Sequence, residues 1–246
     1  MPSGAKNPRS YSSRGFVFLL GLAGAVLFLS SCVYLRLLEV KKQLQDFDAN
    51  FAIGGRSELV IEFKNPLLRT KDVRFLIGAD PLFQTGGEEL LQHFEFDLVR
   101  PSSAAPSVAL ERLSLDLASR RGKLVKIIVP EKFMLLFPRN IVIETLKQAK
   151  DAEVFEMKKL ARAQIHLAPE VEAELPSHAK TLLLLGEPLD SVPEGNLQVL
   201  TYRYRIVGAP REVPISVRLS FDADGLVRKG FVRWDQSSIE ALFSRG

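Results

Sequence analysis

Two stretches of this chain carry the same pattern, and that repetition limits what the chain can fold into. The first covers residues 70–130 and the second covers residues 177–234. Each has a short apolar segment that ends at a glycine, then a polar loop, an alternating strand with aromatic residues, and a hairpin. Phe94 in the first strand corresponds to Tyr202 in the second, 108 residues later. The repetition predicts two copies of one supersecondary unit.

The correspondence continues into the hairpin of each stretch. At an offset of 104 residues it matches three pairs of apolar residues: Leu113 with Val217, Leu115 with Leu219 and Leu117 with Phe221. The offset is 103 at Gly122 and Gly225, two glycines able to take the positive φ of a hairpin turn. This change of offset predicts that the first hairpin turn is one residue longer than the second.

These elements predict an α+β fold made of two tandem units, each a helix with a three-stranded antiparallel sheet. The first unit spans residues 52–138 and the second spans residues 175–246. Residues 139–174 contain good helix formers, with Asn140 as a candidate N-cap, and predict a helical connector between the units. Chance similarity between two unrelated α+β halves is the alternative to a duplication.

The N-terminal residues predict export and attachment to a membrane. A basic, polar stretch is followed by an apolar stretch and then by Leu29, Ser30, Ser31 and Cys32, which is the order found in a signal peptide, here residues 1–31. The last four residues resemble a bacterial lipobox, and that resemblance implies cleavage before Cys32 and lipid attachment to Cys32. The residue after Cys32 is Val33 and not aspartate, which implies an outer-membrane protein that faces the periplasm.

An uncleaved membrane anchor is the alternative to the lipobox. Residues 15–35 are uncharged, mostly apolar and long enough to cross a bilayer, which would give a single-span protein of the inner membrane. Both hypotheses place the basic N-terminus inside and the rest of the chain outside.

An amphipathic helix is expected over residues 32–51, preceding the first unit. Apolar residues recur there at helical spacing, and their stripe includes Leu37, Val40, Leu44 and Phe47. Such a stripe predicts a helix that docks either on the folded domain or on a protein partner. We therefore take these four residues as a candidate partner-contact face.

Charge and residue counts argue against several functional classes. The net charge of +4 falls to about +1 when residues 1–32 are set aside, because Lys6, Arg9 and Arg14 lie there without any acid. A nucleic-acid-binding protein needs a concentrated basic face, so that class is not expected. One cysteine excludes a CxxC redox or zinc motif, three histidines argue against a multi-histidine metal site, and no cofactor is expected.

The sequence also predicts a protein that is not an enzyme. Ser177 begins the pattern S-x-x-K of an acyl-enzyme, but its companion motifs are absent and Ser177 is a natural helix N-cap. The aspartates of Asp222–Gly225 fit a hairpin turn better than a calcium loop, because the twelfth position of such a loop would be Arg233. None of the histidines has a partner acid placed by sequence spacing.

The second stretch resembles a family of small outer-membrane lipoproteins known as SmpA/OmlA or BamE. The likeness rests on Gly186-Glu187-Pro188, on Tyr202-Arg203-Tyr204 and on the hairpin turn that ends at Gly225. It implies a fold used for protein–protein contact in the bacterial envelope, in two tandem copies and without catalysis.

Two functions follow from these observations. The first is a noncatalytic envelope lipoprotein that acts as a scaffold or assembly factor for an envelope protein partner, with no nucleic acid and no small-molecule substrate. The alternative is a periplasmic carrier or chaperone for an apolar ligand such as lipid.

Overall fold

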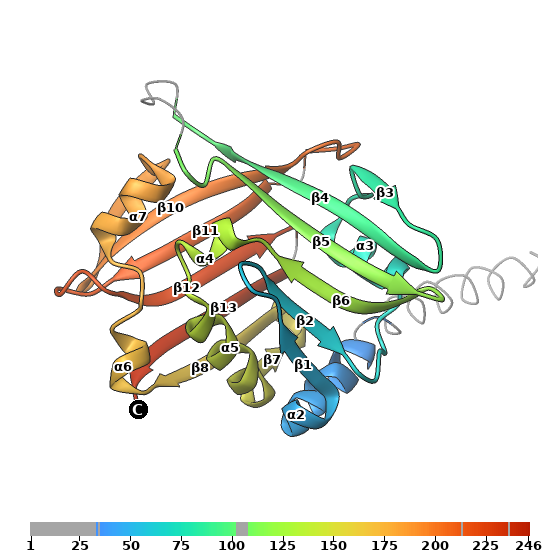
Figure 1. Ribbon diagram of the computed structural model, residues 1–246. Helices are drawn as coiled ribbons and strands as arrows, with labels where there is room; N and C mark the ends of the chain where they lie inside the picture. The colour runs from blue at the N-terminus through green and yellow to red at the C-terminus, as the bar shows by residue number, and fades with distance from the viewer. Residues whose placement is uncertain (1–32, 34, 102–107, 213, 236) are drawn as a thin grey trace, which may run out of the picture.

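The computed structural model describes residues 33, 35–101, 108–212, 214–235 and 237–246, so Cys32 and the expected signal peptide lie outside the described residues (Figure 1). Within these residues thirteen strands form one sheet. The expected α+β fold of two small three-stranded sheets is therefore wrong. The edge strands of a small sheet have unpaired backbone N–H and C=O groups. When the sheets of the two halves join edge to edge, one edge strand of each half becomes hydrogen-bonded.

The strands follow an order across the sheet in which almost all neighbours are antiparallel. From one edge to the other they are β1 (Phe51–Gly54), β2 (Leu59–Phe63), β6 (Lys123–Val129), β5 (Arg112–Arg120), β4 (Glu89–Val99), β10 (Leu197–Ile206), β11 (Pro214–Phe221), β12 (Val227–Trp234), β13 (Ser237–Arg245), β8 (Leu160–Leu167) and β7 (Glu153–Phe155). Two short strands lie off this path, β3 (Phe83–Thr85) beside β4 and β9 (Asp190–Glu194) beside β10.

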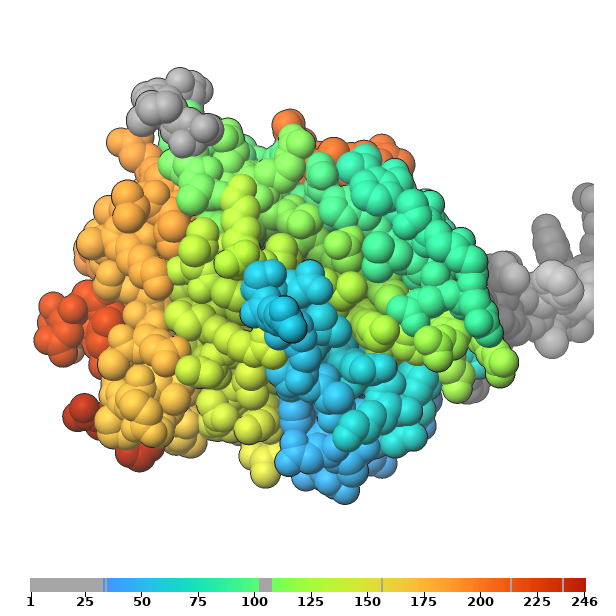
Figure 2. All heavy atoms as spheres, viewed as in Figure 1, coloured from blue at the N-terminus to red at the C-terminus, as the bar shows by residue number. Residues whose placement is uncertain are grey.

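The helices are short. They are α2 (Phe47–Asn50), α3 (Thr70–Ile77), α4 (Glu131–Met134), α5 (Arg139–Gln148), α6 (Pro169–Glu172) and α7 (His178–Leu185), with single 3₁₀ turns at Leu44–Asp46, Ala149–Asp151 and Glu156–Lys158. Residues 35–43 are also helical. Figure 2 shows the yellow-green segment around α5 between the cyan β1–β2 hairpin and the orange segment of α6 and α7.

The connector between the halves is only partly helical, which corrects the prediction for residues 139–174. Its first part forms α5, but its second part forms β7 and β8, and β8 pairs in parallel with β13. From Ala161 to Leu167 every second residue is apolar, and Ile165 and Leu167 are almost fully buried. That alternation places the apolar side chains on one buried face of the sheet. The gain from this burial outweighs the helix propensity of the alanines and lysines nearby.

The two halves of the sheet meet about a local pseudo-twofold axis. Strands β4 and β10 run antiparallel and pair over four residues of each, with Asp97 opposite Arg205. These two residues are themselves equivalent, because the offset of 108 that relates Phe94 to Tyr202 also relates Asp97 to Arg205. A contact between equivalent residues is the signature of a twofold interface.

Backbone contacts on either side of this axis match. In each half, two backbone hydrogen bonds join the start of the helix to the hairpin turn. In the first half they run from Thr70 N to Gly122 O at 3.0 Å and from Leu124 N to Leu68 O at 2.9 Å. The equivalent bonds of the second half run from His178 N to Gly225 O at 2.8 Å and from Val227 N to Pro176 O at 3.1 Å. The helices also end alike, since the N–H of Gly78 donates to Arg74 O and the N–H of Gly186 donates to Leu182 O, each at 2.8 Å.

The strand register corrects the expected offset within the hairpins. Leu117 lies opposite Gln92 and Leu219 lies opposite Leu200, so β5 and β11 correspond at an offset of 102 and not 104. Side chains in a strand alternate with a period of two, so a slip of two residues keeps every apolar residue on the same face and is invisible in the pattern.

The lengths of the two hairpin turns are also the reverse of the prediction. The first turn has only Arg121 and Gly122 between its strands, with φ of 51° and 74°, which is a tight type I′ turn. The second turn spans residues 222–226 and is the longer one. There the carboxylate of Asp222 accepts a hydrogen bond from Leu226 N at 3.0 Å, which closes the wider loop.

Two clusters of buried side chains fill the inner face of the sheet. The first includes Leu98, Leu110, Tyr202 and Phe221, and the second includes Phe94 and its neighbours in β2, β5 and α3. Helix α5 contacts both, because Ile141 belongs to the first cluster while Val142, Ile143 and Leu146 pack against the second. The two halves therefore share packing through α5 as well as through the β4–β10 seam.

Candidate functional site

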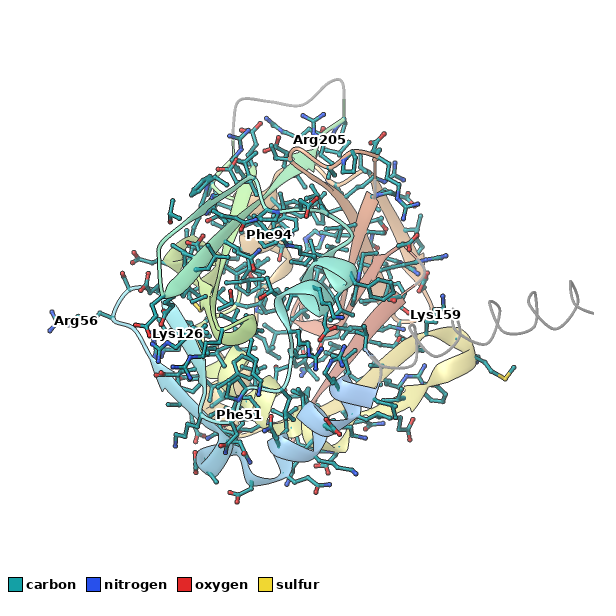
Figure 3. The ribbon with its side chains drawn as sticks, turned by 90° about the vertical axis from the view of Figure 1, so that its right-hand side faces the viewer. Phe51, Arg56, Phe94, Lys126, Lys159 and Arg205 are labelled. Atoms are coloured by element: carbon teal, nitrogen blue, oxygen red, sulfur yellow. The ribbon has the colours of Figure 1, made fainter. Side chains whose placement is uncertain are left out.

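The described residues form two adjoining cavities, and the first lies at the end of α3, the cyan helix near the centre of Figure 3. The first, of about 430 Å³, is lined by the end of α3, by Lys159, by Pro210 and Arg211 and by the turn after β12. The second, of about 360 Å³, has Arg203, Arg211 and Arg233 among its lining residues. They share Arg211 and Asp235. We call the pair the arginine cleft.

The first cavity owes its shape to α3 and to a tryptophan. The helix begins after Arg69, whose N–H donates to the carboxylate of Asp72 at 2.8 Å. It ends at Gly78, which takes a φ of 80° that only glycine adopts without strain. Trp234 lies at the end of β12, and its indole N–H donates to Leu76 O at 2.7 Å. This bond fixes the indole against the helix end as one wall.

Phe75 is the exposed apolar element of the cleft. Its side chain is 58% exposed, although it lies on a helix next to a half-buried tryptophan. Exposed single apolar residues are ordinary, but a phenylalanine at the mouth of a cavity beside tryptophan and arginine has the composition of a protein-binding hot spot.

Backbone strain also occurs at this cavity. Lys159 and Asp235 each have a φ of 47°, and they are two of the three non-glycine residues with positive φ in the described part of the chain. Both line the first cavity. Residues in this conformation cost energy and often occur at functional sites, where the surrounding structure holds them.

The second cavity is lined by three arginines and two acidic residues. Arg203, Ser216 and Arg233 lie opposite one another on β10, β11 and β12, so the two arginines flank a serine on one face of the sheet. Both arginines are exposed, as is Arg211 from the β10–β11 connection. None of these three guanidinium groups makes an ion pair or hydrogen bond with another described residue.

Other arginines on the described surface differ from those of the cleft because they form ion pairs. Arg112 pairs with Asp97, Arg120 with Glu89, and Arg228 with both Glu172 and Asp222. A guanidinium group presents a planar fork of donors that fits a carboxylate bidentately. The three unpaired forks of the cleft can therefore bind an acidic partner without first breaking an internal ion pair.

The residues singled out in the sequence lie elsewhere. Cys32 is outside the described residues. The stripe of Leu37, Val40, Leu44 and Phe47 packs against the second core cluster, so this helix docks on its own domain. Lys41 Nζ fixes it further by donating to Ala152 O at 2.5 Å.

Ser177 is an N-cap, as predicted, because its hydroxyl accepts a hydrogen bond from Lys180 N at 3.1 Å. Asp222 closes a hairpin turn and pairs with Arg228. No group of three or more side chains suited to a metal ion occurs among the residues that the structure covers.

His93 differs from its prediction, because it does have partner acids. Its Nδ1 lies 2.6 Å from Asp116 on the neighbouring strand, and its Nε2 lies 3.3 Å from Glu95 two residues along its own strand. Phe83 stacks on the ring with a centroid distance of 4.4 Å. Sequence spacing could not show the cross-strand acid, which depends on the register of β4 and β5.

Residue types and spacing did not indicate the arginine cleft. Its residues come from four separate segments, 74–80, 159, 203–216 and 233–237. The one signal available was the alternation of Arg203 and Arg205 with the buried tyrosines of β10, which places both arginines on the outer face.

The described helices include none that is both long enough and apolar enough to cross a membrane. Comparisons with protein-family models, with curated proteins and with solved structures find no match to this chain.

Proposed function

We propose that this protein is a noncatalytic lipoprotein of the bacterial envelope, which binds an envelope protein partner through the arginine cleft and acts as a scaffold or assembly factor. The lipobox-like residues that end at Cys32 support membrane attachment. Outer-membrane attachment facing the periplasm is part of the proposal, with a single-span inner-membrane anchor as its alternative.

The observation that carries the partner-binding part is the composition of the arginine cleft. Aromatic residues and arginine are enriched at protein interfaces and dominate their binding energy. Here an exposed phenylalanine and a fixed tryptophan line the same cavity as the unpaired Arg211, and two further unpaired arginines line the adjoining cavity. The two cavities are open and have charged linings, which suits binding of a peptide or a protein surface. An apolar small molecule binds better in an enclosed apolar pocket.

The alternative of a carrier for an apolar ligand finds less support. Such a ligand would need space inside the curved sheet. Packed side chains of the two core clusters occupy that face, including fully buried Tyr202, Phe94 and Phe221.

Membrane attachment is tested by the intact mass of the protein extracted from native membranes. A chain that begins at Cys32 and carries the mass of several acyl groups is the expected result. An unmodified chain that retains residues 1–31 would contradict the lipoprotein and would instead make residues 15–35 an anchor.

Partner binding is tested by photo-crosslinking in native membranes. A benzophenone amino acid replaces Phe75 in one variant and Leu183 in another. Leu183 is the matched control, because it is the equivalent residue of α7, 108 positions later, and its side chain is 77% exposed. We expect a discrete protein adduct from position 75 and none of the same mass from position 183. Absence of any protein adduct from position 75 would contradict the proposed function.

A further inference from the structure

The pseudo-twofold axis relates the arginine cleft to a second place in the same molecule. The cleft lies where the end of α3 meets the β10–β11 connection. Its equivalent lies where the end of α7 meets the β4–β5 connection. The two places have the same backbone framework, so they can be compared directly.

At the α7 end the place is filled by an extended apolar segment of the chain itself. Leu110 is 1% exposed and its N–H donates to Leu184 O at 2.9 Å. Tyr204 Oη donates to Leu110 O at 3.2 Å. Val108 lies against Gly186, since a Cβ at that glycine would be 3.1 Å from Val108 Cγ1. The α7 end is thus covered by main-chain hydrogen bonds and two apolar side chains.

At the α3 end this covering segment is missing. The offset between the halves falls from 108 in β4 and β10 to 102 in β5 and β11, so the β10–β11 connection is six residues shorter than the β4–β5 connection. Here the indole N–H of Trp234 donates a hydrogen bond to the carbonyl of Leu76, which is the residue equivalent to Leu184. The remaining space is the cavity of about 430 Å³, a volume within the range of binding pockets.

The charged residues of the arginine cleft are net positive. Five cationic side chains line the arginine cleft, against three acidic ones: Arg74, Lys159, Arg203, Arg211 and Arg233 against Asp80, Glu212 and Asp235. A segment that covered the α3 end would meet the unpaired Arg211 there, and its extension into the second cavity would meet Arg203 and Arg233.

We infer that the arginine cleft binds an extended acidic segment of a protein partner, which seats an apolar side chain against Phe75 and Trp234 in the place that Val108 and Leu110 fill at the α7 end. Carboxylates of the segment pair with Arg203, Arg211 and Arg233. This inference rests on the proposed function and specifies the chemistry of the partner.

Binding of defined peptides to the full chain in detergent micelles tests the inference. Three labelled heptapeptides are compared by fluorescence anisotropy: DDVALED, which carries the apolar triplet of residues 108–110 between acids, the basic KKVALKK and the acidic but apolar-free DDGSGED. We expect DDVALED to bind at least about tenfold more tightly than the other two.

Charge reversal supplies the matched controls. The double variant Arg211→Glu, Arg233→Glu should weaken DDVALED binding by about tenfold or more. Arg56→Glu should leave it unchanged, because Arg56 is exposed and lies on the opposite side of the molecule from Lys159 (Figure 3). Equal binding of the acidic and basic peptides, or equal effects of the cleft and control reversals, would overturn the inference.

Mapping the adduct from position 75 separates this inference from the proposed function. If the benzophenone at position 75 captures a protein through an acidic segment with an apolar residue, both stand. Capture through a basic or helical segment overturns the inference and leaves the proposed function intact. Adducts with lipid alone overturn both.

Discussion

At the scale of single residues, a buried ion pair fixes the N-terminal helix. Arg36 contacts both carboxylate oxygens of Asp72, at 2.6 and 2.5 Å, and the Asp72 side chain is 1% exposed. We expect Asp72→Asn to lower the free energy of unfolding by about 3 kcal/mol, because it removes the carboxylate that pairs with the partly buried charge of Arg36. Urea unfolding followed by circular dichroism measures the change.

Asp80 provides the control for that substitution. It follows the same helix and pairs with Arg74 at 3.3 Å, but its side chain is 79% exposed. Asp80→Asn should therefore change stability by less than about 1 kcal/mol. Equal effects of the two substitutions would mean that Arg36–Asp72 contributes no more than a surface pair.

The same carboxylate predicts how stability depends on pH. Burial raises the pKa of Asp72, but the hydrogen bonds from Arg36 and from the N–H of Arg69, with the charge of Arg36, outweigh burial and hold its pKa below the usual value. A folded pKa below the unfolded value of about 3.9 gives stability that is complete above that pH and lost as the pH falls through the folded pKa. Unfolding curves from pH 6 to pH 2.5 should show this loss, and Asp72→Asn should reduce it.

At the scale of elements, the start of α7 depends on one hydroxyl. Ser177 caps the helix, and its backbone also bridges to the β11–β12 turn. Ser177→Ala should lower the free energy of unfolding by about 1 kcal/mol, whereas Ser177→Asn should largely keep it, because asparagine is an equally good N-cap. A loss of the same size in both variants would show that capping is not what Ser177 contributes.

The individual elements were easier to predict than their assembly. The Gly-ended helices, the aromatic strands and both hairpins are visible in local patterns, since the glycine at each helix end and the alternation in each strand are local requirements. Segment 160–167 was harder to predict, because Ala161 and Ala163 favour a helix by propensity and a strand by alternation. Only pairing with β13 decides between the two.

The cleft illustrates the same limit. Arg203 and Arg233 become neighbours of Ser216 only through strand register, and Arg211 reaches α3 only because β4 pairs with β10. No spacing in the sequence encodes those pairings. Burial of apolar side chains and edge pairing across the whole sheet determine them, and these are properties of the assembled fold.

At the scale of the whole molecule, the pseudo-twofold halves behave as one cooperative unit. The β4–β10 seam contains four residue pairs, but Leu98 and Leu110 from the first half lie in the same core cluster as Tyr202 and Phe221 from the second. Helix α5 contacts both clusters. Shared packing of this kind couples the unfolding of one half to that of the other.

We therefore expect a single heat-capacity peak in calorimetry, with equal calorimetric and van't Hoff enthalpies. Ile141→Ala should shift that peak without splitting it, because Ile141 is 1% exposed and α5 contacts both clusters. A cost of about 3 kcal/mol corresponds to a fall in Tm of roughly 6–12 °C for a chain of this length. Two resolved peaks in the unsubstituted protein would show instead that the halves unfold separately and that the seam and α5 join them only weakly.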